Sequence, residues 1–334
     1  MKNEPTISVI VPVYNGEQYI NDCLESLFKQ THQAKEIIIV DDGSTDNTSS
    51  LILSPAILIK TDGRLGAGAA RNLGAKKSTG DFLLFTDVDV ITPSNWIEKT
   101  ISVINEKNVR CGGGGYCGPV KNNFMQWFAY EELAWRRRNF YGYVDTLVSN
   151  NLFCERNLFL SAGGFPENYR TASSEDMEFS WKISREESIW WEKNNGVLHN
   201  FASCKNDYLK QQKRFAIDAV PMMLNKKQMI SAKTHHPPGF YIEILLSGLI
   251  TVLIFASLLI PQSTTCLLIS IILLLLINSG FLIAMKKHDN ILIQTILLIY
   301  VRNITIIYGV LVGILRYIRP VSYTHLTLPT IYSV

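Results

Sequence analysis

Apolar residues in the first ninety positions follow two different spacings. Short, nearly continuous apolar runs, typical of buried strands, alternate with segments whose apolar or small residues recur at helical spacing. The predicted strands are residues 7–13, 36–40, 56–59 and 81–86, and the predicted helices are residues 16–30 and 65–77. Near-continuous apolar strands separated by helices are typical of a parallel sheet covered on both faces. We therefore predict an α/β fold with a mostly parallel sheet flanked by helices.

Polar, turn-forming residues follow three of these strands. They occupy segments 12–16, 41–46 and 87–89. Ligands of such sheets bind at the carboxyl ends of the strands, so the three segments are predicted to meet at one binding site. Segment 41–46 also has an ordinary explanation, because Asp-Asp-Gly-Ser can form a turn followed by a helix N-cap.

Asp87 and Asp89 make segment 87–89 the most informative of the three. Two acidic residues one position apart leave a strand tip on the same side. Their oxygens are suitable ligands for a divalent cation, which can in turn hold a diphosphate. Asp-x-Asp alone is a weak signal, and its weight here comes from the matching segments upstream.

The order, spacing and residue types of these motifs closely resemble the family 2 glycosyltransferases of GT-A fold. The resemblance covers roughly residues 5–220 and rests on segments 12–16, 41–46, 68–74, 80–81 and 87–89. It implies an inverting transfer of a sugar from a nucleotide-sugar donor, assisted by Mg²⁺ or Mn²⁺. A divalent ion suits this reaction because it neutralises the diphosphate leaving group as a Lewis acid.

The same resemblance assigns residues to the donor site. It implies that Pro12 and Tyr14 line the base pocket and that Asp41 and Asp42 contact uracil and ribose. Arg71 then approaches the base or the diphosphate, for which its planar cation is well suited. The structural alternative for Arg71 is a helix-surface arginine whose stem packs along apolar surface.

A metal site is implied at the end of the fourth predicted strand. Asp87 is expected to touch the ribose and Asp89 to ligate the metal ion. His199 follows the short apolar strand 196–198, and in several metal-dependent members of the fold a histidine here completes the metal site. Neutral imidazole is a common ligand. A structural histidine remains the alternative for this position.

Glu175 and Asp176 stand before the amphipathic helix 179–185. The family places a Glu-Asp pair here, after a Gly-Gly-Phe segment that residues 163–165 supply. Inverting transfer needs a general base to take the proton from the attacking hydroxyl, and Asp176 is the first candidate, with Glu175 second. Nearby phosphate would raise the pKa of such a carboxylate. Acidic residues at a helix start are also common for dipole reasons alone.

Residues 211–215 resemble the Gln-x-x-Arg-Trp motif of processive membrane synthases, with Phe215 where Trp is usual. Arg214 is still expected to face the diphosphate, although a Gln-rich basic helix is the plainer interpretation. The Phe215 departure argues against a processive polysaccharide synthase. Segment 150–153 matches a family segment near the acceptor, without clear residue roles.

Composition changes this picture little. The net charge of +3 over 334 residues gives no nucleic-acid signal, and the six cysteines show no paired metal spacing. Reduced cytosolic thiols are the default expectation. The chain enters its first strand almost at once, so no secretory signal is expected. Residues 112–115, four consecutive glycines, are predicted to form a flexible loop between the two halves.

The chain becomes strongly apolar after about residue 240. Residues 240–260 and 265–285 are each long enough to cross a hydrocarbon core of ~30 Å at ~1.5 Å per residue. The flanking lysines are Lys226, Lys227, Lys233, Lys286 and Lys287. Lysine and arginine are enriched on the cytoplasmic side of membrane spans, so these lysines predict a hairpin with both ends in the cytoplasm. The catalytic half is accordingly expected at the cytoplasmic face of the inner membrane.

Residues 291–315 are apolar but carry Arg302 and Asn303 at their centre. A third full span would bury Arg302 at a cost of about 2.5–3.5 kcal/mol and would place Arg316 and Arg319 outside. We therefore predict a helix that lies at the cytoplasmic interface or re-enters the membrane.

These patterns predict an organisation by segments. Residues 1–105 form a nucleotide-sugar-binding half, 106–220 an acceptor and catalytic half, 221–239 a linker and 240–320 a membrane region, followed by the tail 321–334. Back-translation of the first ten tail residues resembles a transposon-end adapter of sequencing libraries, so we expect the tail to be non-native.

The expected acceptor is a lipid-linked or cell-envelope glycan, because the anchor holds the site near lipid. A catalytically inactive nucleotide-sugar-binding membrane protein is the alternative from a different class. Intact Asp89 and Asp176 argue against that alternative.

Overall fold

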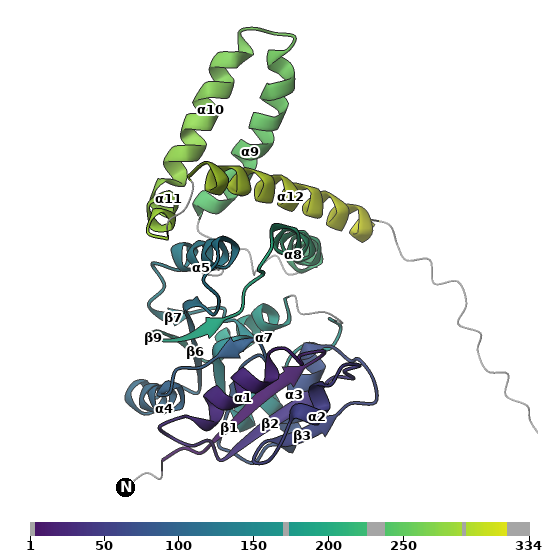
Figure 1. The fold of residues 1–334 in the computed structure, drawn as a ribbon, viewed down its shortest axis with the longest axis vertical. Coiled ribbons are helices and arrows are strands. Elements are labelled where there is room, and N and C mark those ends of the chain that lie inside the picture. Colours follow the sequence, from purple (N-terminus) through teal and green to yellow (C-terminus); the bar gives the residue numbers. More distant parts are fainter. Residues whose placement is uncertain (1–3, 170–173, 226–237, 289–291, 319–334) are drawn as a thin grey trace, which may run out of the picture.

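The computed structural model describes residues 4–169, 174–225, 238–288 and 292–318. A sheet with helices on its faces forms the base of the molecule in Figure 1. Two helices lie above this α/β part, a third lies across them, and a helical hairpin projects from the top. The predicted tail 321–334 lies outside the described residues, as do residues 226–237, which include most of the predicted linker and three of its lysines.

The sheet has nine strands in a mixed arrangement. Its order is β3-β2-β1-β4-β8-β6-β9-β5, and β7 pairs with β9. The strands are β1 (Ile7–Val13), β2 (Glu36–Asp41), β3 (Ile57–Lys60), β4 (Phe82–Phe85), β5 (Val90–Ile91), β6 (Cys111–Pro119), β7 (Gly142–Val144), β8 (Leu152–Glu155) and β9 (Ile189–His199). Strands β1 to β4 are parallel, which confirms the predicted α/β half, whereas β8 joins that half to the others by antiparallel pairing on both sides.

Helices cover both faces of the sheet, as the continuous apolar strands require. They are α1 (Ile20–Phe28), α2 (Thr48–Leu51), α3 (Ala67–Lys77), α4 (Trp96–Lys107), α6 (Arg156–Ser161) and α7 (Glu175–Ser184), with a 3₁₀ turn at Ser149–Asn151. Alternate residues of β1 serve different cores. Val9 and Val11 pack with α1 and α4, whereas Ile10 packs with α6 and α7 on the other face. Both faces of β1 are therefore buried.

The four glycines at 112–115 are not the flexible loop that their composition predicts. They lie inside strand β6 and are buried. A Cβ added to Gly113 would lie 2.3 Å from the carbonyl oxygen of Asn151, and one added to Gly114 would lie 2.1 Å from that of Asn195. Neighbouring backbone approaches this strand so closely that only glycine fits, so the run reflects close packing.

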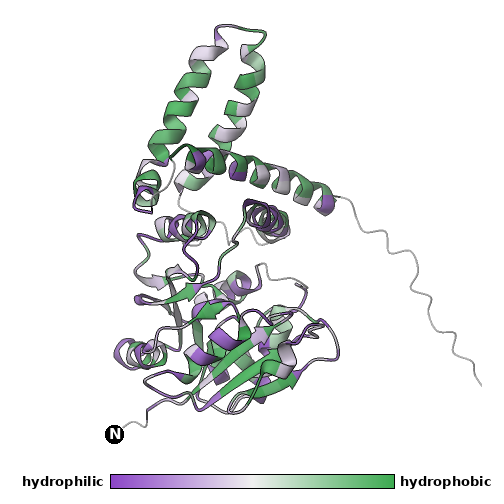
Figure 2. Ribbon diagram, in the orientation of Figure 1, coloured by the Kyte–Doolittle hydropathy of each residue, from purple (hydrophilic) through white to green (hydrophobic). Residues whose placement is uncertain are grey.

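Two helices separate the sheet from the apolar C-terminal region. They are α5 (Phe124–Arg136) and α8 (Lys205–Asn225), and α12 (Leu292–Ile318) lies across them in Figure 1. The projecting hairpin consists of α9 (Pro238–Ser257) and α10 (Ser263–Ile277), and α11 (Ser279–Lys286) returns the chain toward α5. Figure 2 shows that the hairpin is coloured as hydrophobic over most of its length.

The hairpin corresponds to the two predicted spans, with one difference. Helix α9 is long and apolar enough to cross a membrane, but the second apolar run is a pair of helices, α10 and α11, bent by 58°. The side chain of Asn278 donates to the carbonyl of Leu274, and a Cβ on Gly280 would collide with the Trp135 ring of α5. A polar residue and a close helix contact thus interrupt the second run.

Helix α12 meets the length and composition of a membrane span, but it lies crosswise to the hairpin in Figure 1. Its central Arg302 is buried and forms ion pairs with Glu132 of α5 and with Glu243 of α9, the latter at 2.5 Å. Asn303 donates to the Ser247 hydroxyl at 2.9 Å. These contacts satisfy the polar residues in the middle of α12, and its placement at the membrane interface stays a prediction.

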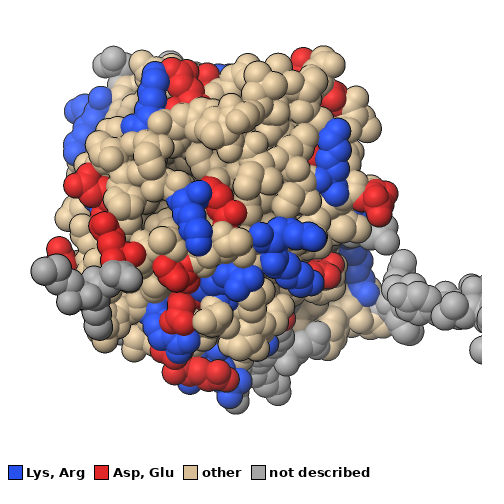
Figure 3. Space-filling model, turned by 90° about the horizontal axis from the view of Figure 1, so that it is seen from below, with Lys and Arg blue, Asp and Glu red and all other residues tan. Residues whose placement is uncertain are grey.

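The face of the molecule opposite the hairpin carries charged side chains of both signs. Figure 3 shows Lys and Arg side chains interspersed with Asp and Glu among uncharged residues on this face. The molecule therefore has an apolar end formed by the hairpin and a charged, mixed-sign end formed by the α/β part.

Candidate functional site

A pocket lies at the carboxyl ends of β1, β2 and β4, where the sequence predicts it. Its lining residues are Pro12, Val13, Tyr14, Asn15, Tyr19, Asp42, Arg64, Gly66, Ala67, Arg71, Asp87, Val88 and Asp89. Of the seven residues expected to bind the nucleotide sugar, five line this pocket, and so does the expected metal ligand Asp89. The strand ends meet here because β1, β2 and β4 are parallel neighbours in the sheet.

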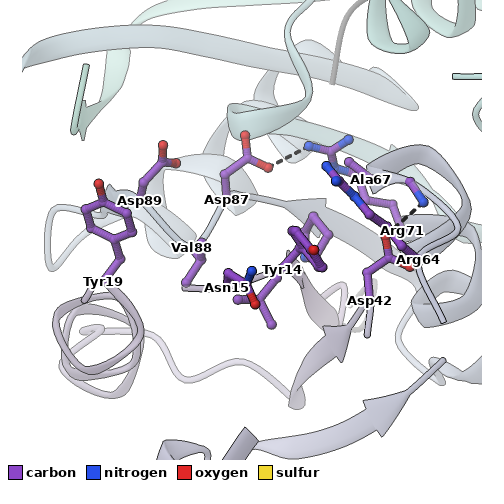
Figure 4. Close-up of a pocket in the computed structure, with 13 residues that line it drawn as sticks. Tyr14, Asn15, Tyr19, Asp42, Arg64, Ala67, Arg71, Asp87, Val88 and Asp89 are labelled. Atoms are coloured by element: carbon purple, nitrogen blue, oxygen red, sulfur yellow. Dashed lines mark hydrogen bonds and ion pairs between the residues drawn. The ribbon is translucent and has the colours of Figure 1, made fainter. Parts of the chain in front are cut away.

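Asp87 and Asp89 point toward the same side of the segment that follows β4 (Figure 4). Arg71, at 2% exposure, donates to Asp87 at 2.6 Å and forms an ion pair with Glu175 at 3.3 Å. It is therefore a buried bridge between the strand tip and the first turn of α7. The alternative of a surface arginine on a helix is wrong for this position.

Asp41 and Asp42 are adjacent in sequence but differ in their surroundings. The buried Asp41 carboxylate accepts from the Ser44 N–H at 2.8 Å and from the Ser49 hydroxyl, and it does not line the pocket. Asp42 accepts from two backbone N–H groups, those of Leu65 and Gly66, each at 2.8 Å, and it does line the pocket. Asp41 thus stabilises the turn after β2, whereas the Asp42 side chain is available to a ligand in the pocket.

Tyr14 presents an exposed ring at the pocket, and the Arg64 guanidinium lies 4.1 Å from the ring centroid. The sequence interpretation missed Arg64, together with Asn15 and Tyr19. The sequence nevertheless indicates Arg64, because this residue belongs to a polar segment, residues 61–64, that directly follows β3. The recognised motifs follow β1 and β2 in the same way.

The expected metal ligands lie near one another. His199, the last residue of β9, has its Nε2 3.6 Å from Asp89 Oδ1. Burial raises the pKa of Asp89, although a protonated His199 would oppose this. In the described ranges no three His, Cys, Asp or Glu side chains form a metal-binding group. One carboxylate and one imidazole fit Mg²⁺ or Mn²⁺ only if further oxygens come from a bound ligand.

Glu175 and Asp176 open α7 but face different partners. Glu175 is buried against Arg71, whereas Asp176 is partly exposed and accepts from the Ser149 N–H at 3.1 Å and the Met177 N–H at 2.7 Å. Burial and the neighbouring charge of Glu175 raise the pKa of Asp176 to about 7. A carboxylate poised near neutral pH can exchange protons efficiently.

Arg214 lies on α8 and does not line the pocket. Its guanidinium carbon is 5.4 Å from the ring centroid of Phe215, and its Nε has no hydrogen-bond partner within the described part of the chain. The expected contact between Arg214 and a diphosphate stays a prediction.

Comparisons with known proteins relate this chain to glycosyltransferases. Residues 8–156 match the family model described as Glycosyl transferase family 2. Over 141 residues the chain is 35% identical to the glycosyltransferase GlyG of Streptococcus pneumoniae serotype 4, covering 38% of this chain and 47% of that protein. It is 30% identical over 174 residues to the glycosyltransferase AglE of Haloferax volcanii, covering 49% of this chain and 57% of that one. The chain thus spans about half the length of these curated relatives.

A solved structure shares the fold over most of the chain. The mannosyltransferase PcManGT from Pyrobaculum calidifontis, in complex with GDP-Man and Mn²⁺, is 18% identical, with a TM-score of 0.56. The likeness covers 93% of this chain and 88% of that protein. At this identity the match describes the fold alone, and it supports the GT-A architecture expected from the motifs.

Proposed function

Because the chain carries a family 2 glycosyltransferase domain over residues 8–156, we propose that it is an inverting glycosyltransferase. It moves a sugar from a nucleotide sugar, a UDP-sugar being the first donor to test, to a hydroxyl of a lipid-linked or cell-envelope glycan. The reaction takes place at the cytoplasmic face of the membrane with Mg²⁺ or Mn²⁺.

The observation that carries the proposal is the connection between the pocket and α7. The pocket is lined by an exposed aromatic ring, Tyr14, and by two carboxylates, Asp87 and Asp89. Arg71 links Asp87 to Glu175, whose neighbour Asp176 has a pKa raised to about 7. Under this proposal Tyr14 supplies a base-binding surface, Asp87 and Asp89 supply a diphosphate-metal region, and Asp176 is a proton acceptor next to the Arg71–Glu175 ion pair.

Each group has a role in donor binding under this proposal. The Tyr14 ring stacks on the nucleotide base, and Asp42 and Asp87 bind the ribose. Arg71 already has two carboxylate partners, so its first role is to hold Asp87 and Glu175 in place. The exposed Arg64 beside Tyr14 is the better-placed cation for an incoming nucleotide.

The transfer step makes one bond to the sugar and breaks another. The acceptor oxygen attacks the anomeric carbon from the side opposite the diphosphate, and its proton passes to Asp176. The bond between the anomeric carbon and the phosphate oxygen breaks, and its electron pair leaves with the nucleotide diphosphate. When bound by Asp89 and His199, Mg²⁺ or Mn²⁺ supplies Lewis-acid stabilisation of that leaving group.

The two ends of the molecule support the proposed membrane placement. The hairpin of α9 and α10 is apolar, and α12 lies crosswise beneath it with apolar side chains exposed, among them Leu297, Leu311 and Leu315. In this arrangement the hairpin inserts, α12 lies at the interface and the α/β part faces water. An acceptor held in the membrane would thus approach through the layer formed by α5 and α8.

The proposal is tested by donor binding to the purified full chain in neutral detergent. Calorimetry with a panel of UDP- and GDP-sugars, with and without Mn²⁺, should identify one donor whose affinity depends on the metal. Asp89→Ala should reduce that metal-dependent affinity at least about tenfold, because it removes a hard oxygen ligand. Asp62→Ala, an exposed residue after β3 that does not line the pocket, is the matched control. Wild-type protein that binds no nucleotide sugar, or unchanged metal dependence in Asp89→Ala, would contradict the proposal.

A further inference from the structure

Beside Asp176 lies a second set of polar groups that the donor site does not use. Arg137 caps the C-terminus of α5 and is 8% exposed, yet its Nε and Nη1 have no hydrogen-bond partner among the residues the structure describes. The buried Asn150 Oδ1 likewise has no partner in the described chain. Buried polar atoms are nearly always paired in folded proteins, so several unpaired ones in the same place point to a missing ligand.

These groups are neighbours. The Asn150 side-chain amide donates to the Tyr116 hydroxyl at 2.7 Å, and the Arg137 guanidinium carbon is 5.6 Å from the Tyr116 ring centroid. Ser149, next to Asn150, donates its backbone N–H to Asp176. We refer to Tyr116, Arg137 and Asn150 as the inner polar cluster, which thus reaches the proposed base through a single residue.

Electrostatics indicate which ligand is missing. A buried guanidinium is costly unless an anion or a set of acceptors surrounds it. Burial lowers the pKa of Arg137, because the buried surroundings disfavour the charged form of the guanidinium. Tyr116 and the charge of Asp176 both act favourably on Arg137, but no carboxylate in the described part of the chain forms an ion pair with it. Arg137 therefore needs an anion, whereas Asn150 Oδ1 needs a hydrogen-bond donor such as a sugar hydroxyl.

We propose that the inner polar cluster is an acceptor subsite that binds a phosphate attached to the acceptor sugar. Arg137 binds the phosphate oxygens, because a guanidinium is well suited to phosphate, and Asn150 accepts from a sugar hydroxyl. The inference rests on the proposed function, and it narrows the acceptor to phosphorylated or phosphate-linked glycans.

The position of α5 agrees with an acceptor that comes from the membrane. The helix lies between the sheet and α12 in Figure 1. Arg136, one residue before Arg137, pairs with Glu132, which also pairs with Arg302 of α12. The C-terminal turn of α5 therefore contacts α12 through Glu132 and also carries Arg137 of the proposed subsite.

The test measures phosphate binding directly, on full-length protein saturated with UDP and Mn²⁺ so that the donor pocket is filled. The first probe is inorganic phosphate in neutral detergent. The second is a phosphatidylcholine nanodisc that contains either a long-chain polyprenyl phosphate or the matching polyprenol. The three variants are Arg137→Met, Arg137→Lys and the control Arg138→Met, whose arginine is exposed and stacks on Trp135.

Arg137→Met should weaken binding of both phosphate probes about 10- to 100-fold, because a charge-assisted hydrogen-bonding partner is lost. Arg137→Lys should retain part of the affinity, and Arg138→Met should bind as wild type does. Phosphate binding without a preference for polyprenyl phosphate over polyprenol would identify a soluble phosphorylated acceptor. A preference for the lipid phosphate would identify a membrane-held one.

Two outcomes would overturn the inference. One is wild-type protein that binds UDP but neither phosphate probe, and the other is equal affinity in wild type and Arg137→Met. If Arg137→Met does not fold, Arg137→Gln takes its place, and equal affinity in wild type and Arg137→Gln decides against the inference in the same way. Failure to bind UDP at all would instead refute the proposed donor function, so the two failures are distinguishable.

Discussion

Glu175 and Asp176 are adjacent carboxylates with different surroundings, and the difference assigns their roles. Glu175 is buried and paired with Arg71, so its charge is compensated and it is held in place. Asp176 has two backbone N–H donors but no ion pair among the described residues. Because burial and the charge of Glu175 raise its pKa, Asp176 is the carboxylate better suited to accept a proton near neutral pH.

Asp176→Asn should lower turnover by about 10²–10⁴, the usual effect of losing a general base. Turnover is measured as nucleotide diphosphate released from the donor that the binding panel identifies. Wild-type activity should also fall as the pH drops below about 7, because a raised pKa means that the base is protonated there. The Asn variant should lack this acidic limb.

Donor affinity in Asp176→Asn should stay near that of wild type, since the pocket does not include this side chain. The exposed Asp22 of α1 provides a control, and Asp22→Asn should leave both turnover and the pH profile intact. Near-normal turnover in Asp176→Asn would move the role of base to Glu175.

At the scale of elements, α12 and α8 form a tight helix pair that depends on two glycines. A Cβ on Gly309 would lie 2.7 Å from the Ala216 Cβ and 2.8 Å from the Lys213 carbonyl oxygen. A Cβ on Gly313 would lie 2.8 Å from Val220 Cγ2. The two glycines are one helical turn apart, so they form a groove on α12 that receives the side chains of α8.

Gly309→Ala should therefore destabilise the protein by about 1–3 kcal/mol, the usual cost of overpacking, despite the better helix propensity of alanine. The measurement is thermal unfolding in detergent. Gly239→Ala is the matched control, because among the described residues a Cβ at that position on α9 meets only Ile277 Cγ2 at 3.8 Å, an ordinary contact. Equal melting temperatures for the two variants would show that α12 and α8 are packed less closely than described.

At the scale of the whole molecule, a buried charge network connects the α/β part to the apolar helices. Glu132 of α5 accepts from Arg136, from Arg302 of α12 and from the Tyr208 hydroxyl of α8. Arg302 also pairs with Glu243 at the start of α9. Breaking a buried pair by removing one partner typically costs about 3–5 kcal/mol, so this network holds the hairpin in a defined position relative to the site.

This position leads to a topology prediction. Reporters inserted before Phe240 and after Lys287 should both read cytoplasmic, because the ends of the hairpin lie on the side of the α/β part. A fusion near Gln262, in the turn between α9 and α10, should read from the opposite side and serves as the control. A periplasmic signal at either hairpin end would overturn the model of catalysis at the cytoplasmic face.

Local patterns in the sequence were sufficient for strands β1 to β4, for helices α1 and α3 and for the position of the pocket, whereas the short helix α2 was not predicted. Each strand is a short apolar run, and parallel strands necessarily bring their carboxyl ends to one edge. The motif segments 12–16, 41–46 and 87–89 could therefore be placed together before the structure was known. Polar residues at 61–64 follow the same rule, and reading them in the same way would have found Arg64.

Tertiary structure alone decided how charged residues pair over long distances. Arg71 pairs with Glu175, 104 residues away, and Arg302 with Glu132, 170 residues away. It also placed the glycines at 112–115 in a buried strand and left the Nε and Nη1 of Arg137 without a hydrogen-bond partner among the described residues. Hydrophobic periodicity depends on neighbours within a few residues, so it specifies elements. The partner of a buried charge depends on which elements the folded chain brings together, and no local pattern encodes that.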